Sequence, residues 1–338
     1  MVTAAGRPGR GQPGQARLGT RSRDGLDGRP DGQRDVVRQP ALARLGLLAL
    51  IWGSSFLWIK LAIRGFSPEE VTLARLVLGA AVLFPVVLAR REPVPRSPRI
   101  WAYIVIAALF ANAAPYLLFA LAEQSVTSAT AGIINATTPL WTMALALAVR
   151  HQQRVTAWQL AGLVVGFGGA LLIFSPWRTA AGLVSAGGAE CLAASVSYAI
   201  SYIYMDRYLV RRGLGPVALS ACQLLAAAVW LSVALPVSGA RVPHPGVASV
   251  TGLIVLGVLG TGVAYVLNYQ IIASEGATIA ATVTYLLPVV AIVLGVLVLG
   301  ERVTALELAG IALVLAGVAL TRRGAAAKAA AARPVEAD

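Results

Sequence analysis

Ten apolar stretches of roughly 20 residues each, the length at which a helix crosses a lipid bilayer, account for most of this chain. Hydrophobic residues make up 57% of the 338 and charged residues only 13%, about half the charged share of ordinary soluble domains. One soluble core of this size could not bury that much apolar surface, so the solvent must be lipid. The sequence therefore predicts an all-α integral membrane protein with ten transmembrane helices, over residues 42–63, 69–89, 100–121, 127–149, 156–175, 183–205, 215–237, 248–271, 277–299 and 304–321.

Both ends of the chain lack an apolar period. Residues 1–41 are polar and rich in Gly, Arg, Asp and Pro, and residues 323–338 are rich in Ala and low in complexity. We expect both segments to be disordered tails, the first of them basic. Because the apolar part of a signal peptide falls within the first ~30 residues, and this segment is polar there, we expect the first span to be retained in the membrane.

An internal repeat divides the apolar region in two. The segment RVTAWQLAG at residues 154–162 returns as RVTALELAG at residues 302–310, with seven of nine positions identical. Self-similarity at a fixed offset indicates duplication, so we expect two related halves of five spans each, residues 42–175 and 183–322. The same offset of 148 or 149 residues relates Gly65–Pro68 to Gly213–Pro216, Arg75 to Gln223, Tyr116 to Tyr265 and Pro139 to Pro288.

The basic residues predict how the spans are oriented. With a cytoplasmic N-terminus, the outside loops hold five of the 28 Lys and Arg residues, Arg75 lies within a span, and the other 22 fall inside. Cytoplasmic segments are the ones enriched in Lys and Arg, so both termini should be cytoplasmic. An odd number of spans per half then inserts the second half upside-down relative to the first, as in many transporters. The Arg-rich, Lys-poor composition suggests a GC-rich bacterial genome, and hence the bacterial cytoplasmic membrane.

A set of residues follows one another in a recognisable order: Ile51-Trp52-Gly53-Ser54-Ser55, Arg75, Pro139, Pro288, the Gly300-Glu301-Arg302 turn, Gly310 and Gly317. In this set, the chain resembles the EamA-type ten-span branch of the drug/metabolite transporter superfamily, over about residues 42–322. The resemblance implies two inverted five-helix repeats around a central cavity, alternating access, and export of small metabolites, amino acids or drugs. Two positions depart from the family's pattern: Gln153, in the place of the acid Glu301, and Tyr198, where the second half commonly repeats the Trp of span one.

Polar and aromatic side chains inside the spans mark the expected substrate cavity. Such groups are costly in lipid and should face a partner helix or water. In the third span Asn112, Tyr116 and Phe119 share one helical face, and the eighth span repeats this stripe. The alternative is hydrogen bonding between helices. We expect nine residues to line the cavity and bind a small-molecule substrate: Trp52, Ser55, Asn112, Tyr116, Asn135, Tyr198, Tyr265, Asn268 and Tyr285.

Four more residues are candidates for gating or coupling, and three of them are Pro139, Pro288 and Glu190. Each proline frees a carbonyl one turn earlier, which a broken helix can offer to a substrate; a simple packing kink is the alternative. Glu190 is protonatable and would couple export to proton entry, since burial favours the neutral carboxyl group. The alternatives for Glu190 are an interhelical hydrogen bond and a carboxylate of the outer vestibule.

Arg75 is the fourth candidate and the one basic residue deep in a span. It could serve gating or bind an anion directly. Alternatively, it snorkels to the headgroups or pairs with Glu69 or Glu70. Glycines at helical spacing in the fifth and tenth spans predict close-packed faces, and a homodimer seam is one use of such faces: Gly162, Gly166, Gly169, Gly310 and Gly317.

Missing motifs narrow the function. The sequence has no HExxH, GxSG-type or Walker A motif and no Cys/His cluster, and Cys191 and Cys222 both lie in apolar runs. We therefore expect no enzyme activity, cofactor or metal, and the net charge of +13 forms no groove for nucleic acid. The leading hypothesis is a secondary transporter that exports a small organic solute, with a proton or counter-solute as coupling partner. The alternatives are a nucleotide-sugar or organophosphate-type exchanger or an importer of the same superfamily, then an intramembrane enzyme or a membrane sensor.

Overall fold

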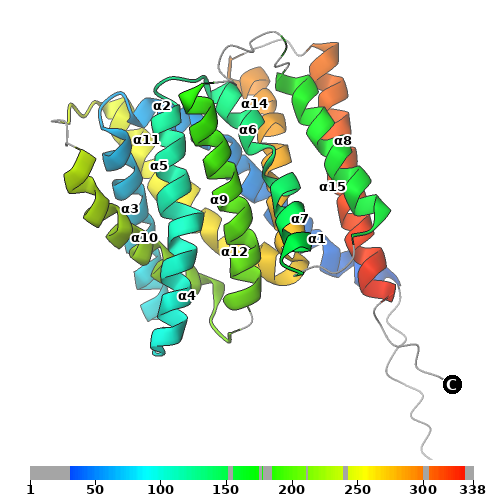
Figure 1. Ribbon diagram of the computed structural model, residues 1–338, viewed down its shortest axis with the longest axis horizontal. Coiled ribbons are helices and arrows are strands. Elements are labelled where there is room, and N and C mark those ends of the chain that lie inside the picture. Colours follow the sequence, from blue (N-terminus) through cyan, green and yellow to red (C-terminus); the bar gives the residue numbers. More distant parts are fainter. Residues whose placement is uncertain are drawn as a thin grey trace, which may run out of the picture. The chain divides into compact units, whose positions relative to one another are not determined.

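The computed structural model describes residues 31–150, 155–174, 177, 185–210, 212–238, 243–299 and 304–331. Within these ranges every regular element is a helix (Figure 1), which confirms the all-α prediction. Pro40–Asp338 form one compact unit. The elements are α1 (Asp31–Gly53), α2 (Ser55–Ala62), α3 (Pro68–Ala89), α4 (Pro98–Ala108), η1 (Leu109–Ala113), α5 (Ala114–Ala122), α6 (Ser128–Asn135), α7 (Thr138–Ala148), α8 (Ala157–Phe174), α9 (Ala186–Tyr208), α10 (Pro216–Ser238), α11 (Val247–Gly257), η4 (Val258–Val263), α12 (Ala264–Glu275), α13 (Ala277–Ala281), α14 (Val283–Leu299) and α15 (Ala305–Ala331).

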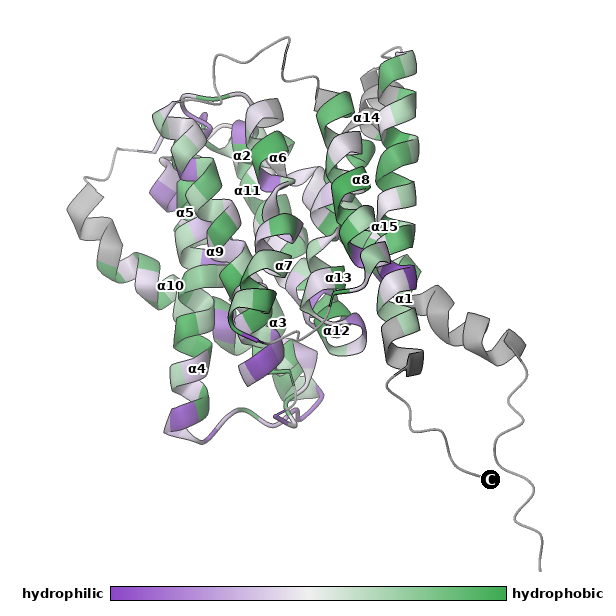
Figure 2. Ribbon diagram, turned by 45° about the vertical axis from the view of Figure 1, so that its right-hand side comes forward, coloured by the Kyte–Doolittle hydropathy of each residue, from purple (hydrophilic) through white to green (hydrophobic). Residues whose placement is uncertain are grey.

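Most helices are apolar along their length (Figure 2), as expected for a protein that lies in lipid. Among the described residues, seven stretches are long and apolar enough to cross a membrane: Ala41–Ala62, Pro68–Ala89, Pro98–Ala122, Thr130–Ala148, Pro216–Val233, Val247–Glu275 and Leu308–Ala327. Ala157–Ile173 and Ala277–Val290 are shorter apolar helices. The chain is thus a multi-pass membrane protein. α9 is not in this set, although it has 23 residues, because Ser, Tyr and Glu residues lower its hydropathy.

The helical ends differ from the predicted tails. α1 begins at Asp31 and α15 continues to Ala331, so parts of residues 1–41 and 323–338, expected to be disordered, are helical. Extending an existing helix adds one hydrogen bond for each residue fixed, without a new nucleation cost. Ala, the best helix former, favours this continuation at the end of α15.

Helices of the first half pack against helices of the second half. α3 packs against α10 and α8 against α15, and each pair joins corresponding spans of the two halves. Figure 1 shows α8 and α15 side by side. In addition α5, from the third span, packs on α9, while α11, from the eighth span, packs on α2. Each half therefore supplies the same neighbours to the other half.

Several spans are broken rather than continuous, and the breaks occur in both halves. α6 and α7 are separated at Ala136 and Thr137, and α13 and α14 at Thr282. At both breaks a threonine hydroxyl bonds a carbonyl three residues earlier, with Thr137 Oγ1 and Thr282 Oγ1 each donating over 2.6 Å. η1 and η4 are π-helical segments at corresponding places of the third and eighth spans. π-helical segments frequently mark functional sites.

The glycine faces predicted for the fifth and tenth spans meet each other inside one chain. A Cβ on Gly317 would lie 2.4 Å from the backbone nitrogen of Gly166, and a Cβ on Gly169 would lie 2.7 Å from the carbonyl oxygen of Gly310. The backbones of α8 and α15 therefore touch where only glycine fits. These glycines pack the two helices together instead of facing outward for a dimer seam.

Candidate functional site

One buried cavity lies between helices of both halves. Its volume of about 60 Å³ exceeds the roughly 10–15 Å³ that one buried water needs. Side chains from α1, α2, α3, α5, α6, α9, α12 and α14 line it. The lining residues are Trp52, Ser55, Ile59, Arg75, Tyr116, Phe119, Asn135, Tyr198, Ser201, Tyr202, Met205, Tyr265, Asn268, Thr284 and Leu287.

The cavity brings together most of the residues selected from the sequence. Seven of the nine expected lining residues are there, namely Trp52, Ser55, Tyr116, Asn135, Tyr198, Tyr265 and Asn268, and so is Arg75. The helix breaks explain part of this set, because Trp52 and Ser55 flank the break between α1 and α2.

Asn112 and Tyr285 are not in the lining. Asn112 is fully buried and accepts a hydrogen bond from Gln223. The Tyr285 hydroxyl donates to the Leu163 carbonyl over 3.0 Å, so this side chain fixes α14 to α8. Both residues therefore form hydrogen bonds between helices, which was the alternative to lining the cavity. The sequence could not separate these two uses, since both require a polar group on a buried helix face.

Pro139, Pro288 and Glu190 also lie outside the lining. Pro139 is in the first turn of α7, where a missing N–H costs nothing, and Pro288 is inside α14. Thr284, whose carbonyl Pro288 was expected to free, does line the cavity. Glu190 is half-buried near the start of α9.

Arg75 is held inside the cavity by two contacts from different helices. Its Nε donates to Thr261 Oγ1 over 3.0 Å, and its guanidinium carbon lies 3.7 Å from the centre of the Tyr116 ring. Arg75 is only 5% exposed. The expected alternative of pairing with Glu70 is absent, because that carboxylate accepts from the Ser67 backbone N–H and caps α3. Arg75 is therefore a positioned cation, and a Tyr face under a guanidinium adds cation–π attraction.

Aromatic rings form a large part of the wall, and carbonyls of the π-helical segments hold two of them. The Trp52 and Tyr265 ring centres are 6.2 Å apart, and Tyr116 meets Tyr265 edge-on at 6.5 Å. Trp52 Nε1 donates to the Gly260 carbonyl in η4 over 3.1 Å, and the Tyr265 hydroxyl donates to the Ala111 carbonyl in η1. A π-helical turn disturbs the regular backbone ladder. In both halves a carbonyl of that turn fixes an aromatic side chain.

Two polar groups of the cavity have no hydrogen-bond partner among the described residues. They are the Tyr116 hydroxyl and the Asn268 Oδ1 atom, and both residues are at most 5% exposed. Buried polar atoms are nearly always hydrogen-bonded in native proteins. Both atoms are buried as well as unpartnered, so their residues hold unused hydrogen-bonding capacity at the cavity wall.

A second polar cluster lies outside the cavity and corresponds to the Arg75 contact. Gln223, the counterpart of Arg75, donates to Asn112, the counterpart of Thr261, over 2.7 Å. The Tyr269 hydroxyl donates to Gln223 Oε1, and both residues are buried. The same contact between α-helix and π-helical segment thus occurs twice, once with a cation and once without.

Helical spacing could have identified some lining residues that the expected set omitted. On α9, Ser201, Tyr202 and Met205 follow Tyr198 at three, four and seven residues, the spacing of one helix face. Ile59, Phe119, Thr284 and Leu287 complete the omitted lining residues. Apolar residues such as Met205 and Leu287 carry no signal in a chain where most residues are apolar.

The fold and the cavity together define a helical membrane protein whose two related halves line one buried cavity. The EamA-like transporter family matches residues 42–175 and again residues 187–323. The chain belongs to this family, which confirms the resemblance seen in its motifs, and membership supports a role in membrane transport.

Three curated relatives are named as transporters. The chain is 24% identical over 278 residues to the uncharacterized inner membrane transporter YedA of Escherichia coli (strain K12), covering 79% of this chain and 86% of that protein. It is 29% identical over 277 residues to a probable terminal-alkyne amino-acid exporter of Streptantibioticus cattleyicolor, covering 80% and 89%. A shorter match is to an S-adenosylmethionine/S-adenosylhomocysteine transporter of Chlamydia trachomatis. It is 34% identical over 128 residues, which cover 37% of this chain and 38% of that protein.

One solved crystal structure shares the fold. It superposes on 86% of this chain and 99% of its own chain with a TM-score of 0.69, at 20% sequence identity. At this level of identity the similarity concerns the fold and not the substrate.

Proposed function

We propose that the protein is a secondary transporter that exports a small organic solute across the bacterial cytoplasmic membrane by alternating access. The cavity around Arg75, Tyr116 and Asn268 is the substrate site. The observation that carries the proposal is that both halves contribute to one buried cavity, with Trp52, Tyr116 and Asn135 from the first and Tyr198, Tyr265 and Asn268 from the second. Binding between two repeats, near broken helices, is typical of secondary transporters.

Ten spans arranged as two inverted repeats are part of this proposal. The reciprocal packing of the two halves, the π-helical segments at η1 and η4, and the helix breaks in both halves support it. Five spans per half would place corresponding gates on opposite sides of the membrane.

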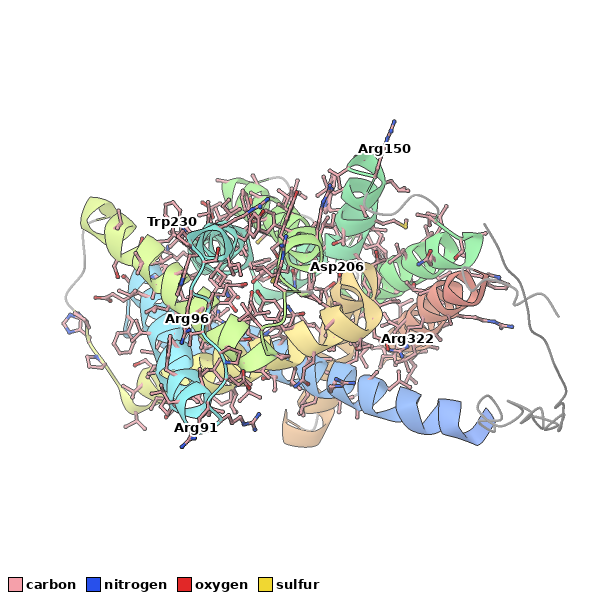
Figure 3. All side chains as sticks on the ribbon, turned by 90° about the horizontal axis from the view of Figure 1, so that it is seen from below. Arg91, Arg96, Arg150, Asp206, Trp230 and Arg322 are labelled. Atoms are coloured by element: carbon pink, nitrogen blue, oxygen red, sulfur yellow. The ribbon has the colours of Figure 1, made fainter. Side chains whose placement is uncertain are left out.

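Both termini are proposed to be cytoplasmic. In Figure 1, α4 begins and α9 and α15 end at the lower end of the unit. Basic residues gather at these points, with Arg96 and Arg99 near the start of α4, Arg207 in the last turn of α9, and Arg322 and Arg323 in α15. Figure 3 shows the unit from this end with Arg91, Arg96, Arg150 and Arg322 labelled. Enrichment of arginine on one side supports a cytoplasmic orientation for it.

Export of an organic solute without a phosphate group fits the lining better than exchange of organophosphates. The cavity offers aromatic faces, two amides and a single cation, whereas a phosphate dianion would draw on more positive charge or on bidentate arginine pairs. The relative from Streptantibioticus cattleyicolor, named as a probable amino-acid exporter, supports the direction. A proton or a counter-solute is the proposed coupling partner.

An export screen tests the proposed function. Cells that overproduce the wild-type protein are compared with cells producing Asn268→Ala or Tyr116→Ala, and metabolites are measured inside the cells and in the medium. We expect at least one small solute to move to the medium with the wild type and less with either variant. Tyr204→Ala is the matched control, because Tyr204 packs against Tyr208 outside the cavity. Equal pools for wild type, both variants and an empty vector would refute the proposal.

A further inference from the structure

Arg75 carries a buried charge with no acidic side chain against it in the described part of the chain. Its contacts there are Thr261 Oγ1 and the Tyr116 ring, neither of which is an anion. An ion pair does form elsewhere, between Arg322 of α15 and Glu275 of α12. An arginine remains protonated in proteins. Burial of a cation without a counter-charge costs free energy, so an anion from outside the chain would stabilise this state.

The guanidinium group of Arg75 keeps donors at the cavity wall that the described protein does not use. Arginine has five N–H donors, and the contact to Thr261 uses the one on Nε. The two terminal nitrogens have no protein acceptor among the described residues. The Thr261 contact and the Tyr116 ring hold the guanidinium group in place, and the planar fork of an arginine matches the two oxygens of a carboxylate.

The corresponding site of the other half shows that the fold does not require this charge. Gln223 contacts the π-helical segment η1 as Arg75 contacts η4, but its side chain is a neutral amide. It is fully buried and forms hydrogen bonds with Asn112 and Tyr269. A cation is therefore present only in the half where the contact opens into the cavity. This asymmetry points to ligand recognition, since a purely structural contact would be served by glutamine in both halves.

We propose that Arg75 binds the carboxylate of an α-amino-acid-like zwitterion, with Asn268 accepting from its ammonium group and the aromatic wall holding an apolar side chain. This inference rests on the proposed transport function and adds the substrate class to it. Asn268 Oδ1 and the Tyr116 hydroxyl, both buried and unpartnered in side chains of the cavity wall, supply the polar contacts. Trp52, Phe119 and Leu287 line the apolar side. Thr261 is a positioning residue that aims the guanidinium group.

The single positive charge of the site disfavours two other solute classes. A solute with only a cationic group would face Arg75 and be repelled. A phosphate dianion would meet one cation and no second basic residue in the lining. A zwitterion brings one anionic group that pairs with Arg75 and one cationic group for an amide oxygen and the π faces.

Paired probes test this assignment by binding to the purified full-length protein in nanodiscs. The probes are alanine, valine, leucine, methionine, phenylalanine and tryptophan, each with its carboxamide, which keeps the shape and the ammonium group but removes the anion. Loss of a buried, hydrogen-bonded charge pair weakens binding by about 30-fold or more. We therefore expect at least one amino acid to bind the wild type about 30-fold more tightly than its carboxamide.

Variants at Arg75 separate charge from folding. Arg75→Gln reproduces the residue that occupies the corresponding place at Gln223, so it is expected to fold, and it should bind acid and carboxamide alike. Arg75→Lys should keep part of the preference, because it keeps the charge but not the planar fork. Thr261→Val should weaken the preference without removing it. Thermal unfolding of each variant checks that it is folded.

The outcomes distinguish this inference from the proposed function. If carboxamides bind the wild type as well as the acids, if none of the probes binds, or if Arg75→Gln keeps the preference, the assignment of Arg75 is overturned. Flux into proteoliposomes is measured in parallel for the same probes and for a mixture of labelled amines and neutral solutes. Flux of amines or neutral solutes alone would support the transport function and refute the assignment of Arg75. Binding that depends on Arg75 without any flux would support the assignment and refute the transport function.

Discussion

Gln223 is the centre of a buried polar cluster that stabilises the fold without touching the cavity. It donates to Asn112 over 2.7 Å and accepts from Tyr269, and all three side chains are at most 1% exposed. Gln223→Leu would leave two buried polar partners unsatisfied. We expect it to lower the free energy of unfolding by about 1–2 kcal/mol, measured by thermal unfolding in detergent, with little change in substrate affinity.

The matched control replaces the whole cluster. In the triple variant Asn112→Leu, Gln223→Leu, Tyr269→Phe no buried partner is left unpaired, and removal of both sides of a hydrogen bond is close to neutral. The triple variant should therefore be more stable than Gln223→Leu alone. A triple variant that loses the sum of three separate penalties would contradict the stabilising role assigned to the cluster.

Glu190 is the acidic residue whose role the sequence left open between proton coupling and structure. The side chain is half-buried near the start of α9 and does not line the cavity. We expect Glu190→Gln to transport with an unchanged pH dependence, measured as proteoliposome flux from mildly acidic to mildly alkaline pH. A shifted pH profile in Glu190→Gln, with normal folding, would instead assign the coupling role to this carboxyl group.

At the scale of elements, α8 and α15 depend on backbone contact through glycine. A Cβ on Gly169 would meet the Gly310 carbonyl and the Val314 nitrogen at 2.7 Å, whereas a Cβ on the neighbouring Gly168 meets nothing within 4 Å. We expect Gly169→Ala to destabilise the protein by about 2 kcal/mol or more, because the two backbones must separate. Gly168→Ala should be neutral or stabilising by up to about 1 kcal/mol, since alanine favours the helix.

Thermal unfolding of these two single-methyl variants gives the comparison directly. Both add the same atoms to the same helix, one position apart, so general effects of expression or detergent cancel. Similar melting temperatures for Gly168→Ala and Gly169→Ala would show that the close approach of α8 and α15 does not exist.

The elements show how far the sequence alone could predict this fold. Apolar length and breakers such as Gly65–Pro68 located the seven long apolar helices of the described residues, because a membrane tolerates few charges over 20 residues. The helix breaks at Ser54 and Thr282 and the π-helical segments η1 and η4 were not predictable. Carbonyls of the two π-helical segments accept from side chains of other helices, as when Trp52 bonds the Gly260 carbonyl, and that information lies more than 200 residues away along the chain.

At the scale of the whole molecule, the repeat explains which site residues were predictable. Tyr116 and Tyr265 were found because the duplication places them at the same depth of corresponding spans, and both line the cavity. Asn112 was expected beside them, yet its counterpart Thr261 bonds Arg75 and Asn112 itself bonds Gln223. The two halves therefore differ at this contact, and only Arg75 lines the cavity. A repeat predicts position in the fold but not which copy of a contact reaches the cavity.

Alternating access requires the cavity between the halves to open to each side of the membrane in turn. Ser55 lies in its wall and is 8% exposed, and the native Cys191 and Cys222 are both buried. The most direct measurement is labelling of Ser55→Cys, in a protein with Cys191→Ala and Cys222→Ala, by a small membrane-impermeant thiol reagent. The reagent is added to right-side-out and to inside-out vesicles. Arg96→Cys, in an exposed loop, is the control that should react from one side only.

Under alternating access, Ser55→Cys reacts in both kinds of vesicle, and a transported solute slows both reactions. Labelling from a single side, with Arg96→Cys behaving as expected, would contradict alternating access at this cavity.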